Sequence, residues 1–253
     1  MIANESPLFQ YLIQLGDDAL ILSHRLSEWC GHGPVLEQDI ALTNIALDIL
    51  GQSRLWYQYA AEQTTAELDE DKLAYFRSDT EYRNVILVEQ PNGDWGQTVA
   101  RQFLHDNFKL LLFKELAKSS QPVVAEIAHK CQIETTYHVK WANEWLVRLG
   151  DGTVESNKRV QQGLNKMWRF HLELIQPSGV DLEMHGMGIA PDLNELKGQY
   201  AFILEQIIKR ANLQIPKSQN VITGGKKGIH SEHLGFILAE MQHLQRSYPG
   251  QNW

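Results

Sequence analysis

Apolar residues recur at steps of three and four along most of the chain, and no segment alternates apolar with polar residues in the manner of a strand. That spacing places apolar side chains on one face of an α-helix. We therefore predict one all-α domain over residues 1–253, built on a bundle of long helices. Residues 79–95 and 176–191 are predicted to be loops. The predicted helices cover residues 7–28, 35–63, 94–118, 122–150, 155–175, 192–212 and 231–246.

The helix predicted over residues 122–150 carries two polar residues within an apolar face. Read at alternating steps of three and four, that face consists of Val124, Ile127, Cys131, Glu134, His138, Trp141 and Trp145. Burying an unpaired carboxylate costs several kcal/mol. Glu134 therefore requires a proton, a partner or a metal ion.

Acids interrupt two further apolar faces. Asp48 borders the apolar stripe of the helix over residues 35–63, and Asp106 interrupts that of the helix over residues 94–118. Ferritin-like bundles hold two metal ions with a Glu from each of two helices and a Glu-x-x-His pair from each of the other two. One hypothesis is therefore a carboxylate-bridged metal pair at Asp48, Asp106, Glu134 and His138.

The ligand spacing argues against a functional metal site. The residue three before His138 is Thr135, and the residue three after Asp106 is Lys109, whose ammonium takes the space and charge of a metal. We predict that Asp106 pairs with Lys109 and Glu134 with His138. On this interpretation the polar core formed by Asp48, Asp106, Lys109, Glu134 and His138 is the remnant of a metal site, and the chain itself binds no metal.

Charge and composition exclude several classes of protein. The formal net charge is −8, and the sequence contains no basic stretch that could contact a row of phosphates. Both observations argue against a general nucleic-acid binder. Cys30 and Cys131 supply neither a disulfide framework nor a cysteine-rich metal site. No apolar run is long enough to span a membrane, and the first residues do not resemble a signal peptide. We expect a cytoplasmic protein.

One glycine-rich segment offers a second kind of chemistry. Residues 224–228 contain three glycines with Lys226 and Lys227, so backbone amides and two cations are available to an anion. The alternative is a flexible loop before Ser231, which caps the last helix. The sequence leaves both interpretations open.

Five short stretches, in order along the chain, carry a family resemblance. They are LSEWCGH at 26–32, LDILGQ at 47–52, LVEQPNG at 87–93, TGGKKG at 223–228 and PGQNW at 249–253. The sequence resembles the family of C subunits of phenylacetyl-CoA epoxidase. The resemblance implies a ferritin-like fold with additional C-terminal helices, in a non-catalytic structural subunit.

The resemblance also implies partners and a cofactor outside this chain. In that family the partner is the di-iron catalytic subunit of a multicomponent monooxygenase, which epoxidises the ring of phenylacetyl-CoA during aerobic phenylacetate catabolism. Other epoxidase subunits are further expected partners. This chain is then expected to carry no cofactor of its own.

Two loops are candidates for contact with phenylacetyl-CoA. The first is the polar turn of Glu81, Tyr82, Arg83 and Asn84, whose guanidinium suits a phosphate and whose neighbours suit the amides of a pantetheine arm. The second consists of Leu182, Glu183 and Met184. Partner-facing or solvated loops are the alternative. An acyl-CoA-binding module using Arg83 and the two lysines, and an oxygenase in its own right, are the rival functions.

Overall fold

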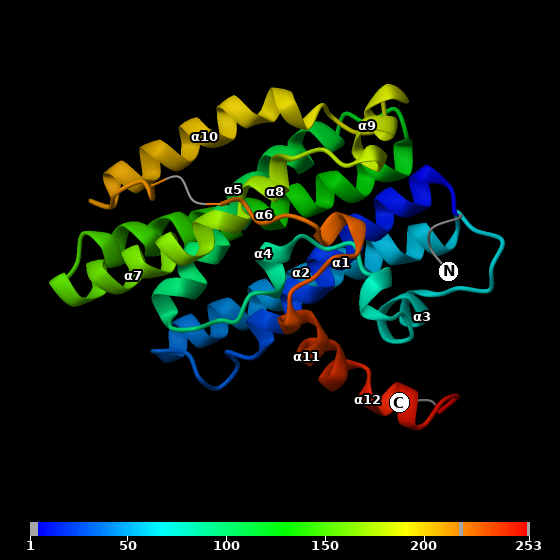
Figure 1. The fold of residues 1–253 in the computed structure, drawn as a ribbon, viewed down its shortest axis with the longest axis horizontal. Coiled ribbons are helices and arrows are strands. Elements are labelled where there is room, and N and C mark those ends of the chain that lie inside the picture. The colour runs from blue at the N-terminus through cyan, green and yellow to red at the C-terminus, as the bar shows by residue number, and fades with distance from the viewer. Residues whose placement is uncertain (1–4, 218–219, 252–253) are drawn as a thin grey trace. The chain divides into compact units, whose positions relative to one another are not determined.

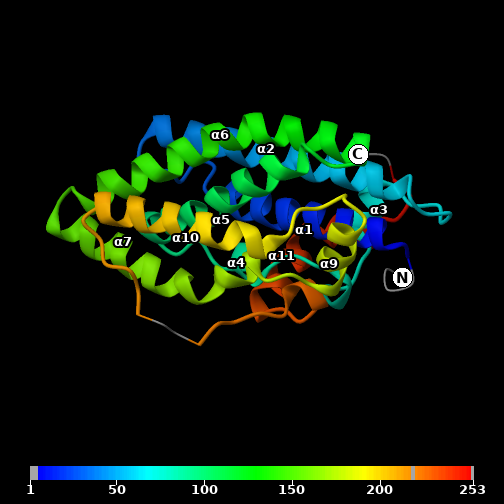
Figure 2. The same ribbon diagram turned by 90° about the horizontal axis from the view of Figure 1, so that it is seen from above.

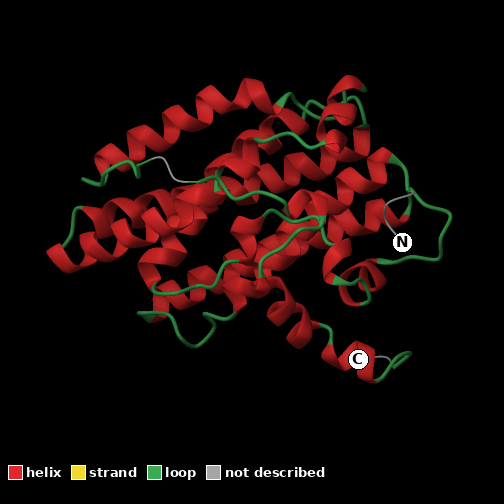
Figure 3. Ribbon diagram, in the orientation of Figure 1, coloured by secondary structure: helices red, strands yellow, loops and turns green. Residues whose placement is uncertain are grey.

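The computed structural model describes residues 5–217 and 220–251. Within these residues the chain forms helices and loops only (Figure 3). The predicted fold class, all-α and ferritin-like with additional C-terminal helices, is confirmed. Asn252 and Trp253, which end the PGQNW stretch, lie outside the described residues.

The chain divides into two compact units. Unit 1 comprises the described residues of Met1–Pro91 and Gly224–Trp253, and unit 2 comprises those of Asn92–Thr223. Each unit is built on a pair of long helices that pack against each other. The expectation of a single domain over residues 1–253 is not tested by this division and stays a prediction.

Unit 1 is organised around α1 (Pro7–Ser27) and α2 (Leu36–Ala61), which lie side by side (Figure 1). The Ser6 side chain accepts a hydrogen bond from the Phe9 amide at 3.2 Å, and Pro7 supplies the fixed φ of a first helical position. Most residues of α1 are buried, including the charged Asp17, Asp18 and Arg25 as well as the apolar residues. The remaining elements are α3 (Glu70–Tyr75), η2 (Asp79–Glu81), α4 (Ile86–Glu89), η4 (Gly225–Lys227), α11 (Glu232–Met241) and α12 (His243–Ser247).

The structure corrects two predictions in unit 1. The loop predicted over residues 79–95 contains η2 and α4, which are too short for a helical period to show in the sequence. The helix predicted over residues 231–246 is divided at Gln242 into α11 and α12. The buried Gln242 amide donates to the Ala74 and Arg77 carbonyl oxygens at 3.3 and 3.0 Å. These long-range bonds connect the residue at which the helix divides to the 74–77 segment.

Unit 2 is organised around α5 (Trp95–Leu116) and α6 (Pro122–Gly150), with α7 (Val154–Met167) packed against α5 (Figure 2). The Asp94 carboxylate accepts from the Gln97 amide at 2.9 Å and so caps α5. The predicted bounds of α6 are confirmed, since Pro122 opens the helix and Gly150 ends it. The remaining elements are η3 (Trp168–Phe170), α8 (Leu172–Ile175), α9 (Gly179–Gly186) and α10 (Leu193–Arg210).

Two predictions in unit 2 are wrong. The helix predicted over residues 155–175 divides into α7, η3 and α8, and His171 Nδ1 lies 2.5 Å from the Trp168 carbonyl oxygen at the division. The ring thus satisfies a carbonyl that a continuing helix would bond to its own backbone. The loop predicted over residues 176–191 contains α9. A reciprocal capping box between Ser178 and Asp181 starts that helix, and the sequence carries this signal.

Candidate functional site

The interior of unit 2 contains a cluster of polar side chains on α5. Asp106 is 1 % exposed, and its Oδ1 lies 2.8 Å from His105 Nδ1. Gln102, one turn earlier, donates to both carboxylate oxygens of Asp106 at 3.4–3.5 Å. Lys109 is 5 % exposed, so both members of the predicted Asp106–Lys109 pair are buried. The pair itself stays a prediction.

The inward face of α6 agrees with the predicted face at most positions, with Thr135 rather than Glu134 buried. Cys131, Thr135 and His138 are buried, whereas Glu134 is half-buried at the edge of that face. Positions 134 and 135 lie on either side of the line through residues 131 and 138, so helical spacing alone does not choose between them. The predicted Glu134–His138 pair is not tested.

The polar core of unit 2 does not fit a dinuclear metal centre. Thr135, three residues before His138, is buried and offers a hydroxyl where a metal site would need a carboxylate. Lys109 is buried one turn from Asp106 and places an ammonium there. Among residues 5–217 and 220–251, no group of three or more His, Cys, Asp or Glu side chains is arranged to hold a metal ion. Asp48 is half-buried on α2 of unit 1. We therefore derive no reaction step through a metal in this chain.

The first substrate-binding candidate, residues 81–84, is held by a buried carboxylate on α1. Asp17 is fully buried and accepts from the Arg83 amide at 2.6 Å, from the Tyr57 hydroxyl at 2.5 Å and from the Arg77 guanidinium. Burial acts to lower the pKa of Arg77, but the charge and hydrogen bond of Asp17, together with the charges of Tyr57 and Tyr82, outweigh burial and raise that pKa. Arg77 and Asp17 thus form a buried ion pair that fixes the turn.

Within that turn the four candidate residues differ. Tyr82 and Asn84 are fully buried, with the Tyr82 hydroxyl 2.5 Å from the Ala74 carbonyl oxygen. Glu81 accepts from the Ser78 amide at 3.0 Å and caps η2. Arg83 is half-buried and donates to the Thr80 and Tyr82 carbonyl oxygens at 2.8 and 2.7 Å. Contact with an acyl-CoA stays a prediction for all four, and for Tyr82 and Asn84 it would require leaving the interior.

The second candidate, residues 182–184, lies on α9. Leu182 is 54 % exposed and Glu183 is also exposed, whereas Met184 is fully buried in the core. The buried Met184 side chain therefore anchors α9 to the core, whereas Leu182 and Glu183 face solvent. Their contact with substrate stays untested.

The glycine-rich segment packs against the same 81–84 turn. A side chain at Gly225 would collide with the Asn84 carbonyl oxygen, and one at Gly228, whose φ is +77°, with the Thr80 carbonyl oxygen. The glycines are thus explained by close approach of two backbone segments. Beyond them, Ser231 N–H donates to Glu89 Oε1 at 2.7 Å, and His230 Nδ1 lies 3.1 Å from Glu89 Oε2. Glu89 is fully buried and anchors the segment.

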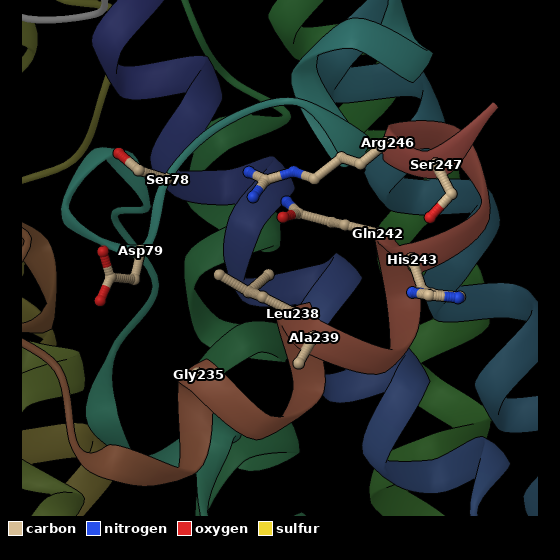
Figure 4. A pocket seen from close by; sticks show the side chains of 9 residues that line it. All are labelled: Ser78, Asp79, Gly235, Leu238, Ala239, Gln242, His243, Arg246 and Ser247. Carbon is tan, nitrogen blue, oxygen red and sulfur yellow. The ribbon is translucent and has the colours of Figure 1, made fainter. Parts of the chain in front are cut away.

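A cavity of about 400 Å³ opens between η2 and the two C-terminal helices (Figure 4). Leu238 and Ala239 form its apolar part, and Arg246 extends toward the segment that carries Ser78. Arg246 donates to the Arg77 carbonyl oxygen at 2.8 Å. The cavity thus combines the Arg246 guanidinium, which already donates one hydrogen bond, with a small apolar surface. We assign no catalytic role to its lining residues.

The whole chain, residues 1–253, matches the family model described as phenylacetic acid catabolic protein. The chain belongs to this family. It is also 47% identical over 246 residues to the C subunit of 1,2-phenylacetyl-CoA epoxidase from Escherichia coli (strain K12). That alignment covers 97% of this chain and 99% of the relative. The resemblance seen in the five short stretches is confirmed.

Sequence reasoning missed the two buried ionic contacts of this family member. Asp17 and Asp18 stand between the apolar runs 11–15 and 19–22, broken only by Gln14 and Gly16, and this is the signal that carboxylates are buried there. Their partners cannot be read from the sequence, since Arg77 lies 60 residues away along the chain.

None of the described helices combines the length and apolar character that crossing a bilayer requires.

Proposed function

We propose that this chain is the C subunit of a phenylacetyl-CoA epoxidase and that it supports the assembly without performing its chemistry. The observation that carries the proposal is the 47% identity to the Escherichia coli C subunit, which extends over 97% of this chain and 99% of that relative. The proposal keeps the cytoplasmic location expected from the sequence.

The non-catalytic role is supported by the polar core of unit 2. Oxygen insertion into an aromatic ring needs a redox-active centre. Lys109 is buried where such a centre would need a ligand, and Thr135 is buried where a Glu-x-x-His pair would need its acid. We therefore assign the chemistry to the di-iron catalytic subunit, with other subunits of the epoxidase completing the complex.

The contribution of this chain is then to present rigid surfaces. The Asp17–Arg77 pair and the Glu89–His230 contact hold the 77–91 segment and the start of the C-terminal segment in one arrangement. In some proteins buried polar contacts specify one geometry more than they add stability, and we propose this role for the two contacts here. A subunit that stabilises the conformation of a partner requires such a fixed geometry.

The test is a reconstitution from separately purified chains. We expect this chain to co-elute in a heteromer with the catalytic subunit in size-exclusion chromatography with light scattering, and iron to follow the catalytic subunit in elemental analysis. Epoxidation of phenylacetyl-CoA should require both chains together with a reductase and oxygen. Near-stoichiometric iron or manganese in this chain alone, with turnover, would establish it as an oxygenase. Binding of phenylacetyl-CoA by this chain alone in calorimetry would instead support the acyl-CoA-binding alternative.

A further inference from the structure

One side of α2 presents large apolar side chains to solvent. Leu36, Ile40, Leu47 and Leu50 are 72%, 52%, 60% and 42% exposed. At 100° per residue they fall within an arc of about 80°, on the side of the helix opposite the buried Ile45. They extend about 21 Å along the helix axis. We refer to these four residues as the α2 stripe.

The stripe leads into a groove between α2 and α3. This groove has a volume of about 480 Å³, and Leu47, Leu50 and Arg54 of α2 line it together with Asp71 and Tyr75 of α3. Its volume suffices for several side chains of a docked segment. An apolar row that ends in a groove between two helices is the geometry in which an amphipathic helix is bound.

The segment of the chain that carries the stripe and the groove is acidic. Between Leu36 and Tyr75 the sequence contains eight acidic and two basic residues, a formal net charge of −6 within a chain of −8. One of the two bases, Arg54, is already paired with Glu70, at 3.3 Å between Nε and Oε1. Burial, followed by the charges of Glu70 and Asp69, raises the pKa of Asp71 in the groove. A second copy of this chain would bring like charges together here, so the occupant carries the opposite charge.

We propose that the α2 stripe and its groove dock an amphipathic helix of the catalytic subunit, with its apolar face on the stripe and Lys or Arg side chains along its flanks. The apolar residues of that helix cover Leu36, Ile40 and Leu47, and its cations face Asp71 and the acids that precede it. The inference rests on the proposed function for the identity of the partner. The apolar face and its acidic border are properties of this chain alone.

The test compares two double variants of the full chain. The stripe variant, Leu36→Glu with Leu47→Glu, places two negative charges on the stripe. The control variant, Val154→Glu with Phe202→Glu, places two negative charges elsewhere. Val154 of α7 and Phe202 of α10 are apolar residues that are 89% and 61% exposed. Affinity for the purified catalytic subunit is measured by calorimetry, and folding is checked by circular dichroism. We expect the stripe variant to raise Kd at least tenfold and the control variant to change it less than about twofold.

Charge is tested separately. Raising NaCl from about 0.1 M to about 1 M should weaken the wild-type complex, and Asp71→Lys should weaken it severalfold at low salt. A wild-type complex that the stripe variant leaves intact would overturn this inference while the proposed function stands. Wild-type self-association abolished by the stripe variant would overturn it in favour of a second copy. If the wild-type chain does not bind the catalytic subunit, the proposed function is contradicted, and this inference with it.

Discussion

His230 lies between two hydrogen-bond acceptors, the Glu89 carboxylate and the Tyr82 carbonyl oxygen. Its Nδ1 is 3.1 Å from Glu89 Oε2 and its Nε2 is 3.0 Å from the Tyr82 oxygen. A carbonyl oxygen and a carboxylate oxygen accept hydrogen bonds, so a ring protonated on both nitrogens satisfies the two contacts at once. The geometry therefore favours the charged form of His230. Burial acts to lower the pKa of His230, but the hydrogen bond and charge of Glu89 outweigh burial and raise it, with smaller contributions from Tyr82 and Asp17.

This contact predicts a pH-dependent part of the stability of unit 1. The folded-state pKa of His230 lies above the unfolded value of about 6.5. The stabilisation is therefore complete below about pH 6.5 and is lost as the pH rises through the folded-state pKa. His230→Gln should lower the free energy of unfolding by about 1–3 kcal/mol near pH 6, and by less near pH 9. Urea unfolding at the two pH values measures both. The exposed His243, replaced by Gln, serves as the control, and an equal loss at both pH values would contradict a charged ring.

Replacing Asp17 by Asn should destabilise the protein strongly. The variant leaves the buried Arg77 guanidinium without its carboxylate, and loss of one partner of a buried pair costs about 3–5 kcal/mol. The midpoint of urea unfolding, followed by circular dichroism, measures the loss. Glu62→Gln, at an exposed acid of the same unit, should leave the midpoint unchanged. Equal midpoints for the two variants would show that Asp17 does not anchor the turn.

Lys109→Ala tests whether the polar core of unit 2 is charge-compensated. Asp106 and Lys109 are both buried, so removal of the ammonium should leave a buried acid undercompensated at a cost of about 3 kcal/mol or more. Lys114→Ala on the same helix is the matched control, because Lys114 is exposed. If the two variants unfold at the same denaturant concentration, the predicted pairing of Asp106 with Lys109 is wrong.

Gly225→Ala tests the close approach of the glycine-rich segment to the 81–84 turn. The added methyl group would collide with the Asn84 carbonyl oxygen, so a backbone segment must move, at about 1–3 kcal/mol. Gly235→Ala is the matched control, since nothing lies within 4 Å of a Cβ there and the residue is inside a helix. The control should be neutral or stabilising by up to about 1 kcal/mol. A neutral Gly225→Ala would reopen the anion-binding interpretation of the segment.

Local signals decided which elements could be predicted. The bounds of α6 follow from Pro122 and Gly150, and the apolar period of α5 is long enough to read. The last helix divides at Gln242, whose side chain contacts carbonyl groups more than 160 residues earlier, and no pattern near Gln242 indicates those contacts. Elements of three or four residues, such as η2 and α4, are shorter than any period that the sequence can display.

The candidate site was predicted in part. Asp106, Lys109 and His138 are buried as the helical spacing indicates, but the spacing placed Glu134 rather than Thr135 inward, because both neighbour the same line along α6. The Asp17–Arg77 and Glu89–His230 contacts join residues 60 and 141 positions apart. Such pairs depend on tertiary packing, which a single sequence does not encode in any local pattern.

The division of unit 1 across the chain has a consequence for biosynthesis. The ribosome makes α1 to α4 first, then all of unit 2, and only afterwards the residues from Gly224 onward. At about 5–20 residues per second, the intervening residues take on the order of ten seconds to appear. During that time the bonds that Glu89 makes with His230 and Ser231, and those that the Ala74 and Arg77 oxygens make with Gln242, cannot form. The first unit to be started is therefore completed last, by the residues on either side of α11.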